Sequence, residues 1–506
     1  MLDFRDGTLF GNDAGEDELP EVLASYFVGQ PAFLPFLSVS NRLHIARSRK
    51  GMGKSALLSK LNFDLLENDP LAIVVRSTGS QLSGSSIPEF SNLLEAQSYW
   101  VSRISSRINM ELGTKVGFAF SDTQMSLVEA AELSGLKERN FIGALLSRIK
   151  IKKLPIEILE PTRQPNPDLL LQRAIEDFGE KPVWLLVDDI DASYVDTPQQ
   201  QLLTSAFFSA CRYVAREMRG VHIRTTVRSD VWSNLRSNED LDKCEQYIVE
   251  IHWTKNELKS ILAKKITAWI LRKNLLLTSI IRTDDEAIEL AFHKKLRWGN
   301  HMVAPFQAIN ILAAGRPRWV SQLCRLAGVA AVKAAKSKIT ISEINSSMDQ
   351  FTRFRINDLY KEHGHQFAKL EKLIHSFIGP KVRFTTDELV SHINRMFVGP
   401  VGAARVGLVD GEEYSSPKQL ARLLFKVGFL VGREQSGNDN SNAKYISYAQ
   451  FPELLEHFSE LERDIVWEIY PSYRQRAKAR DFAFVESRSS GPLDQKTRRR
   501  GRSSSR

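Results

Sequence analysis

The residues best suited to chemistry form a short glycine-rich stretch at residues 50–56, KGMGKSA. Its two glycines let the backbone turn where a Cβ would clash, so that successive N–H groups can point inward at phosphate oxygens. Lys54 can supply a point charge to β- and γ-phosphates, and the hydroxyl of Ser55 can bind Mg²⁺. The stretch matches the phosphate-loop pattern G-x-x-x-x-G-K-[ST], except that Ser48 replaces the first glycine. The predicted phosphate-binding residues are Lys50, Gly51, Met52, Gly53, Lys54, Ser55 and Ala56.

A phosphate loop needs an acidic partner at the end of a neighbouring strand, and the segment after the apolar run 183–187 supplies one. Asp188 follows that run directly and is the candidate for binding Mg²⁺ through water, together with Ser55. Asp189 is the candidate for polarising the attacking water. Three neighbouring carboxylates repel one another, and a divalent cation would relieve that repulsion. Asp191, the third of them, is alternatively a helix N-cap.

Two arginines lie where a γ-phosphate sensor is expected. Arg228 ends the apolar run 221–227 and so lies at the carboxyl edge of the sheet, where ligands bind in open α/β folds. Residues 315–319, GRPRW, start a new helix with two guanidiniums, and either Arg316 or Arg318 could contact phosphate oxygens in a fork geometry. The candidate catalytic residues are Asp189, Lys54, Arg228 and Arg318.

The elements that must position these residues follow from the apolar pattern. Four further apolar runs, at residues 43–46, 71–75, 221–227 and 247–251, join the run at 183–187, and segments of helical spacing separate most of them. Continuous apolar runs are typical of parallel strands covered on both faces. The sequence therefore predicts an α/β fold with a parallel sheet of the P-loop NTPase type. This strand–loop–helix context favours a phosphate loop over a glycine-bearing turn with a coincidental Lys-Ser pair.

Changes of pattern along the chain divide it into five predicted parts. Residues 256–340 are helical almost throughout, with breaks near 298–300 and 315–318, and residues 416–448 show the helix, strand, turn, strand order of a winged helix. The predicted parts are an acidic N-terminal segment (1–40), a P-loop core (41–255) with a helical insertion (88–153), a helical lid (256–340), a winged-helix domain (341–470) and a basic, largely disordered tail (471–506).

Composition excludes several classes of protein. The chain has 506 residues, 42% of them hydrophobic and 25% charged, which is typical of a packed globular protein. Three cysteines without ligand spacing exclude a disulfide scaffold and a zinc ribbon. No apolar run reaches the length of a membrane span, and the acidic N-terminus is unlike a secretory signal, so we expect a cytoplasmic protein that does not contact membranes.

The net charge of +9 belongs mostly to the tail. Residues 471–506 carry +8, which leaves +1 for residues 1–470. A Ser/Arg-rich end of this kind cannot bury enough apolar surface to fold. Its charge could attract polyanions such as DNA, or it could serve only solubility.

The motifs together resemble the AAA+ and STAND class of P-loop ATPases. They are the phosphate loop, LLVDDID at residues 185–191, VRSD at 227–230 and GRPR at 315–318. With the opening LFGNDAGEDE at residues 9–18, the chain is more narrowly similar to a family of bacterial P-loop ATPases often encoded near anti-phage defence genes. The resemblance implies ATP and Mg²⁺ as ligands, Arg228 at the sensor 1 position and Arg318 at the sensor 2 position. Asp189 stands where many AAA+ proteins carry glutamate. Because aspartate is the shorter carboxylate, the resemblance predicts slow hydrolysis or a switch.

Three functions remain open at this stage. The first is an ATP-hydrolysing switch, acting as a homo-oligomer or with a separate effector protein, for which Arg236 is a guess at an arginine finger. The second is a DNA-binding protein tuned by ATP, using Lys418, Gln419, Arg422 and Lys426 on one helix face. A solvated face on a packed winged helix is the favoured interpretation of those four residues. The third is an adaptor that recruits an effector through its insertion or tail.

Overall fold

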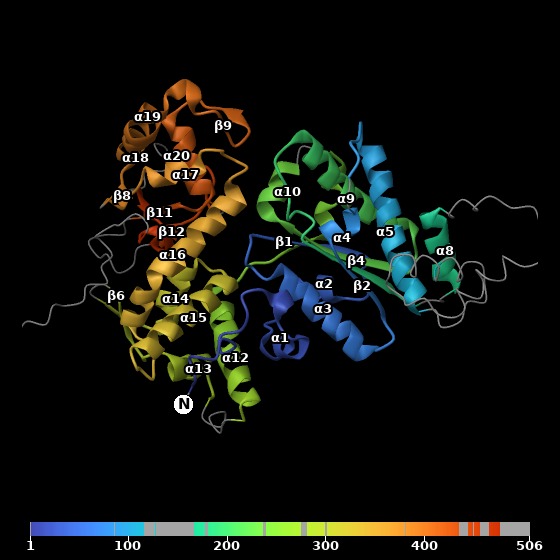
Figure 1. The fold of residues 1–506 in the computed structure, drawn as a ribbon, viewed down its shortest axis with the longest axis horizontal. Helices are drawn as coiled ribbons and strands as arrows, with labels where there is room; N and C mark the ends of the chain where they lie inside the picture. The colour runs from blue at the N-terminus through green and yellow to red at the C-terminus, as the bar shows by residue number, and fades with distance from the viewer. Residues whose placement is uncertain are drawn as a thin grey trace, which may run out of the picture.

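The structure is a computed structural model that describes residues 2–84, 87–115, 127, 166–177, 181–235, 239–274, 281–298, 301–379, 381–434, 444–448, 450–455 and 465–475. Figure 1 shows two bodies side by side: a sheet with helices on both faces, and a mainly helical body that ends in a small sheet. None of the helices in these residues combines the length and the apolar content needed to span a bilayer.

A five-stranded parallel sheet forms the first body and confirms the predicted fold class. Its spatial order is β2-β3-β4-β1-β5, so that β4 separates β1 from β3. The strands are β1 (Leu43–Ser48), β2 (Ile73–Thr78), β3 (Val183–Asp188), β4 (Val221–Arg228) and β5 (Ile248–Glu250). All five predicted runs are therefore strands, with β2 beginning two residues later than its apolar run.

Both faces of this sheet are buried, as the apolar runs predict. On β3, Val183, Leu185 and Val187 pack into one hydrophobic cluster, while Trp184 and Leu186 pack into another on the opposite face. The first cluster includes residues of α5, α9 and α10, and the second includes residues of α3. The helices of this body are α3 (Lys54–Asn68), α4 (Gly79–Ser83), α5 (Leu93–Lys115), α8 (Pro167–Asp177), α9 (Pro198–Glu217), α10 (Ser229–Leu235) and α11 (Glu239–Asp242).

The first part of the predicted insertion is a core helix. Trp100, Ile104 and Ile108 of α5 are buried against the sheet, and Trp100 Nε1 donates a 2.9 Å hydrogen bond to the carbonyl of Leu203 on α9. The apolar spacing of α5 is thus explained by packing within the core. Apart from Leu127, residues 116–153 of the predicted insertion lie outside the described residues.

The predicted N-terminal segment packs on both bodies. Its helices are α1 (Pro20–Tyr26) and α2 (Leu34–Leu37). Phe33 and Phe36 are buried in the cluster with α3, whereas Leu9 and Phe10 belong to the core of the helical body. The segment therefore connects the two bodies through buried apolar contacts.

The helical body begins at Lys255. Its helices are α12 (Lys255–Arg272), α13 (Asp284–Ala291), α14 (Pro305–Ala313), α15 (Pro317–Lys333) and α16 (Ile341–His363). At the predicted break near residues 298–300 the chain forms a hairpin, β6 (Leu296–Trp298) with β7 (His301–Val303). The second predicted break coincides with the end of α14, where the C-cap Ala314 (φ +50°) and then Gly315 (φ +70°) lie in the left-handed region.

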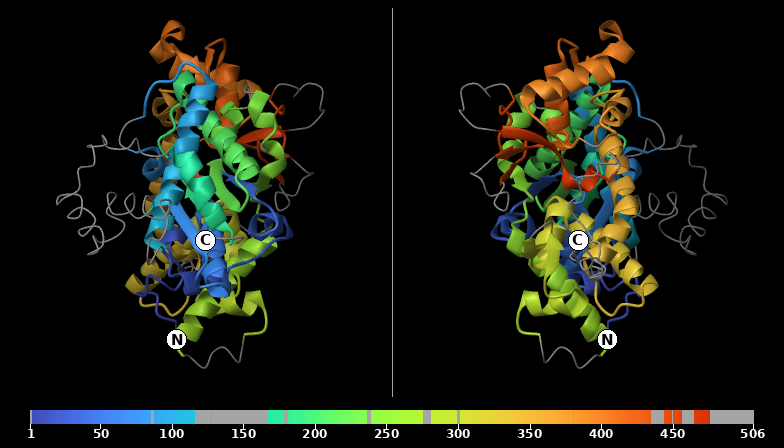
Figure 2. Two further views of the ribbon diagram at one scale, coloured as in Figure 1. Left: turned by 90° about the vertical axis from the view of Figure 1, so that its right-hand side faces the viewer. Right: turned by 90° about the vertical axis from the view of Figure 1, so that its left-hand side faces the viewer.

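A four-stranded antiparallel sheet, ordered β12-β11-β13-β8, lies beyond α16. Its strands are β8 (Arg383–Phe384), β11 (Leu430–Glu434), β12 (Lys444–Ile446) and β13 (Ile465–Ile469). The flanking elements are α17 (Leu370–His375), α18 (Thr386–Ile393), α19 (Gly399–Val401), the hairpin β9 (Leu408–Val409) with β10 (Glu412–Glu413), and α20 (Pro417–Lys426). In Figure 2 the region around α18–α20, in orange, lies at the opposite end of the molecule from the N-terminus.

The order α20, β11, β12 agrees with the helix, strand, turn, strand order expected of a winged helix. The sequence pattern missed both β13, which pairs with β11, and β8, which pairs with the other edge of β13. The predicted turn at residues 436–442 and residues 476–506 of the basic tail lie outside the described residues.

Candidate functional site

The predicted phosphate loop connects β1 to α3. Gly51 and Gly53 have φ values of +78° and +104°, a region that favours glycine and explains both residues. Side chains from elsewhere hold the loop: Trp253 Nε1 donates a 2.7 Å hydrogen bond to the carbonyl of Met52. The backbone N–H of Arg318 donates to the carbonyl of Gly51 at 3.3 Å. The loop is thus held by Trp253, which lies just before α12, and by Arg318, which lies in the first turn of α15.

Lys54 opens α3 with its side chain almost completely enclosed, at 9% exposure. Its Nζ donates a 3.2 Å hydrogen bond to the carbonyl of Ser48 at the end of β1. Burial lowers the pKa of the Lys54 ammonium, and the nearby Asp191 and Asp188 carboxylates oppose that shift. The site therefore holds a desolvated cation on the phosphate loop, which strengthens its attraction for a phosphate oxygen.

The predicted acidic residues lie at the carboxyl end of β3. Asp188 Oδ1 accepts a 2.5 Å hydrogen bond from Thr226 Oγ1 on β4 and a 3.0 Å hydrogen bond from the backbone N–H of Asp189. Asp189 has a φ of +52°, an uncommon conformation for a residue with a Cβ. Partial loss of hydration, and then the negative charges of Asp188 and Asp191, raise the pKa of Asp189 to about 6. The turn after β3 thus concentrates negative charge.

Asp191 is buried, and its Oδ2 accepts a 2.6 Å hydrogen bond from the backbone N–H of Arg228. The Arg228 side chain lies between two carboxylates, with Nη2 3.1 Å from Asp230 Oδ2 and Nε 3.8 Å from Asp191 Oδ2. These contacts hold Arg228 at the end of β4. The N-cap role considered for Asp191 is replaced by this link between the ends of β3 and β4.

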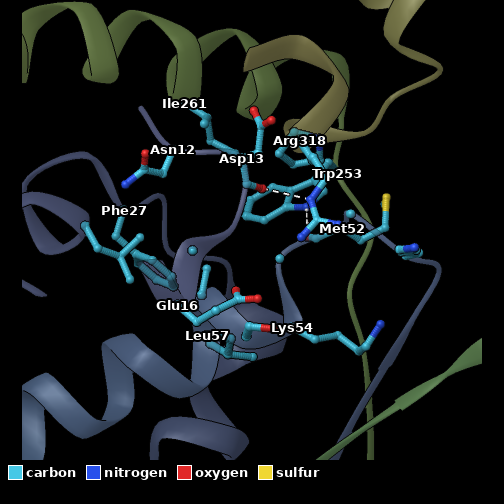
Figure 3. Close-up of a pocket in the computed structure, with 18 of the residues that line it drawn as sticks. Asn12, Asp13, Glu16, Phe27, Met52, Lys54, Leu57, Trp253, Ile261 and Arg318 are labelled. Carbon is cyan, nitrogen blue, oxygen red and sulfur yellow. Dashed lines mark hydrogen bonds between the residues drawn. The ribbon is translucent and has the colours of Figure 1, made fainter. Parts of the chain in front are cut away.

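A cavity of about 330 Å³ brings most of the predicted residues together. Residues 50–56 line it with Asp189, Asp191, Arg228 and Arg318, whereas Asp188 is absent from its lining. The larger apolar side chains of its wall are Leu23, Tyr26, Phe27, Val28, Phe33, Leu57, Trp253 and Ile261. Figure 3 shows Asp13, Arg318 and Trp253 gathered on one side of this cavity, with Glu16 and Lys54 lower in the same view.

The sequence analysis did not predict the wall formed by the N-terminal segment. Asn12, Asp13 and Glu16 line the cavity. Lys265 of α12 also lines it and is buried, with Nζ 2.8 Å from Ser321 Oγ and 4.9 Å from the centre of the Tyr26 ring. The only sequence signal for this wall was the motif at residues 9–18. That motif supported the family resemblance, but no function was predicted for its residues.

No group of three His, Cys, Asp or Glu side chains suited to a metal ion occurs among the described residues. The predicted metal ligands, Ser55 and Asp188, supply only two oxygen-bearing side chains. Mg²⁺ usually keeps several waters and binds one or two protein groups together with substrate phosphates, so two such residues are sufficient to hold it.

The sheet topology, the glycine-dependent loop after β1 and the buried Lys54 define an α/β protein of the P-loop class. The loop and the carboxylates of β3 meet at the carboxyl edge of the sheet, where ligands bind in open α/β folds.

No protein-family model and no curated protein matches the chain. Among solved structures, the chain is similar to Cdc6p from Pyrobaculum aerophilum, at 14% identity over 90% of this chain and 98% of that chain, with a TM-score of 0.35. It is similar to the ORC2 protein from Aeropyrum pernix in its ADPNP-ADP complexes, at 11% identity over 90% of this chain and 98% of that chain, with a TM-score of 0.38. It is also similar to the RuvB Holliday junction branch migration motor from Thermotoga maritima, at 13% identity over 86% of this chain and 95% of that chain, with a TM-score of 0.31.

Proposed function

We propose that this protein binds ATP in the cavity at the carboxyl edge of the sheet and hydrolyses it as a nucleotide-driven switch. The observation that carries the proposal is the position of the buried Lys54 on a phosphate loop whose cavity also includes Asp189 and Arg228. A site that pairs a cationic loop with carboxylates suits a phosphorylated substrate and its metal ion better than an uncharged ligand.

Two parts of the cavity wall suit two parts of a nucleotide. At the loop, the ammonium of Lys54 and the N-terminus of α3 provide positive charge for the triphosphate. Aromatic residues from the N-terminal segment, such as Tyr26 and Phe27, provide an apolar surface on which a base can stack. Nucleotide binding would therefore bring the N-terminal segment and the core together around one ligand.

Hydrolysis requires a water molecule activated next to the γ-phosphate. Asp189, with its raised pKa, is the residue proposed to orient that water and accept its proton. Mg²⁺, when bound, would be held by Ser55 and, through water, by Asp188, and it would neutralise charge on the phosphates. Thr226 and the N–H of Asp189 both bind Oδ1 of Asp188, and neither hydrogen bond involves Oδ2.

The switch is proposed to act through α15. Arg318 lies in the first turn of that helix, lines the cavity, and binds the loop at Gly51 through its backbone N–H. A γ-phosphate that attracts the Arg318 guanidinium would favour one position of α15 relative to the loop, and hydrolysis would remove that preference.

The test is ATP hydrolysis by the purified full chain, with and without duplex DNA, together with its mass in solution with ATP. We expect ATP-dependent phosphate release that Lys54→Ala abolishes. Phosphate release by Lys54→Ala at the wild-type rate would contradict the proposal. Turnover stimulated by DNA would favour the second candidate function, and assembly driven by ATP without DNA would favour a switch.

DNA, a homo-oligomer and a separate effector protein stay predictions as partners, as does a role in bacterial defence. On α20, the proposed DNA-contacting Lys426 is paired with Asp410, and the Gln419 side chain accepts a 2.9 Å hydrogen bond from the N–H of Ser415. These contacts within the domain support the interpretation of that face as a packed, solvated surface. Arg236, the guess for an arginine finger, lies outside the described residues.

A further inference from the structure

One residue of the phosphate loop, Lys50, has both its backbone N–H and its carbonyl bound by a buried ion pair. The backbone N–H of Lys50 donates a 3.2 Å hydrogen bond to Glu362 Oε1, and the carbonyl of Lys50 accepts a 3.2 Å hydrogen bond from Arg316 Nη1. Arg316 Nη1 is in turn 3.1 Å from Glu362 Oε2. The three residues form a closed arrangement, the Lys50 clamp, in which the charged pair contacts both polar groups of one residue.

The members of the Lys50 clamp come from three parts of the chain. Lys50 belongs to the loop after β1, Arg316 precedes the first turn of α15, and Glu362 lies in the last turn of α16. A second acidic residue of α16, Asp358, lies 3.8 Å from Lys50 Nζ. The end of α16 is therefore docked on the phosphate loop through two carboxylates.

Burial makes this contact strong and specific. Glu362 is 4% exposed and Arg316 is 7% exposed, and the Arg316 guanidinium stacks 4.3 Å from the centre of the Trp319 ring. Burial is the largest single effect and would raise the pKa of Glu362, but the charge and hydrogen bond of Arg316, together with the charges of His363 and Lys50, outweigh it and lower the pKa to about 2. The pair thus stays ionised at neutral pH. Removing one partner would leave the other charge buried without compensation, which is strongly unfavourable.

We propose that Glu362 and Arg316 are positioning residues that hold the phosphate loop in the shape needed for nucleotide, and so make nucleotide affinity depend on the docking of α16. A loop that is already ordered loses less conformational entropy on binding its ligand. The inference rests on the proposed function, since it concerns the same loop. Because coupling between two binding events is reciprocal, bound nucleotide stabilises the docking of α16 by the same free energy.

The chain offers a matched control on the same helix. Glu343 of α16 is also buried and also paired, with its Oε1 2.7 Å from Lys336 Nζ, but it lies in the first turn, at the opposite end from Glu362. Glu343→Gln therefore reports the general effect of losing a buried carboxylate from α16. Glu362→Ala removes the clamp, and Glu362→Gln keeps an acceptor for the Lys50 N–H but loses the charge.

The experiment measures ATP affinity and steady-state kinetics of the full chain. For Glu362→Ala we expect Kd and KM to rise at least about tenfold, because a charge-assisted contact is lost, while kcat at saturation stays within about threefold. Glu362→Gln should fall between Glu362→Ala and the wild type, and Glu343→Gln should bind like the wild type. Equal affinity in Glu362→Ala and the wild type, or an equal loss in Glu343→Gln, would overturn the inference.

A second measurement does not require nucleotide. Amide hydrogen exchange of residues 50–53 in the nucleotide-free chain should be faster in Glu362→Ala than in the wild type and unchanged in Glu343→Gln. Unchanged exchange in Glu362→Ala would overturn the clamp. If the wild type bound no ATP, the proposed function would fail, while exchange would still decide whether Glu362 orders the loop.

Discussion

Arg318 Nε donates a 2.8 Å hydrogen bond to the backbone carbonyl of Asp13, at the rim of the proposed nucleotide cavity. The Asp13 carboxylate binds the same helix, α15, through Gln322 Nε2 at 2.8 Å and through an ion pair with Arg325. The N-terminal segment is therefore fastened to α15 immediately beside the phosphate loop. Arg318 contacts this segment and lines the cavity, so its two roles need separate tests.

Arg318→Ala and Arg325→Ala separate these roles. Both variants lose one contact with Asp13, but only Arg318 lines the cavity. We expect Arg318→Ala to lower kcat/KM for ATP by about 100-fold, as removal of a group that stabilises transferring phosphate does. Arg325→Ala should lower it less than about threefold. Parallel kinetic measurements check this prediction, and equal losses would mean that Arg318 acts only by fastening the N-terminal segment.

Asp189→Asn tests the proposed general base. An amide cannot accept the proton of the attacking water, so kcat should fall by about 100-fold or more while KM changes little. The raised pKa gives a second check, because the base works only when it is deprotonated. The wild-type kcat/KM should therefore rise with pH up to about 6 and level off above it. If the residual kcat/KM of Asp189→Asn still rose with pH up to about 6, that rise would have to be assigned to a titratable group other than Asp189.

The same pKa predicts an effect on stability without nucleotide. A carboxyl group with a raised pKa binds its proton more tightly in the folded chain than in the unfolded chain. Its contribution to stability is therefore present at low pH and is lost as pH rises through about 6. At pH 7.5, Asp189→Asn should unfold at a higher temperature than the nucleotide-free wild type, and this difference should shrink at pH 5. Thermal unfolding at the two pH values measures it, and a lower melting temperature at pH 7.5 would contradict it.

Gly15→Ala tests the packing of the N-terminal segment on α3. A Cβ at Gly15 would lie 2.6 Å from Cβ of Ala56, so either the segment or the start of the helix must move. Overpacking of this kind costs about 1–3 kcal/mol, and we expect ATP affinity to fall by about tenfold. Gly7→Ala is the matched control, because a Cβ there would meet no atom within 4 Å. Titration of both variants with ATP decides the prediction, which fails if Gly15→Ala binds as well as Gly7→Ala.

Arg224→Met tests the attachment of the N-terminal segment to the sheet. Arg224 is 0% exposed, lies on β4, and donates hydrogen bonds of 2.6 to 2.8 Å to the carbonyls of Phe36, Ser38 and Asn41. Methionine fills similar space but leaves these carbonyls without their donor, so unfolding free energy should fall by about 3–5 kcal/mol. Arg216→Ala, at an exposed ion pair, should change it by less than about 1 kcal/mol. Urea unfolding of both variants provides the comparison.

The parts of the site that could be predicted from sequence are encoded by contiguous residues. The loop at residues 50–56 needs glycine at two positive φ values, and the acidic residues follow a strand whose apolar run is unbroken. Both signals are local, because the chemistry and the backbone that presents it lie within a few residues of each other. The five strands were predicted for the same reason.

The parts of the site that could not be predicted depend on contacts between residues far apart in sequence. Glu362 reaches Lys50 across 312 positions, and its sequence context, the polar end of an amphipathic helix, is shared by many residues with no such role. Asp13 and Tyr26 acquire their positions only because the N-terminal segment packs on both bodies. The apolar spacing of α5, which lies in the predicted helical insertion, does not reveal which surface the helix covers.

ATP binding by the full chain, compared with binding by Lys54→Ala, tests the central claim most directly. Isothermal titration with ATP and Mg²⁺ should give saturable binding of one nucleotide per chain in the wild type. Lys54→Ala should lose at least about 100-fold in affinity, because it removes the buried cation that faces the phosphates. Lys60→Ala removes a partly buried lysine of the same helix that pairs with Asp64 and is absent from the cavity lining, so this variant should bind as the wild type does. Micromolar binding retained by Lys54→Ala would contradict the proposed site.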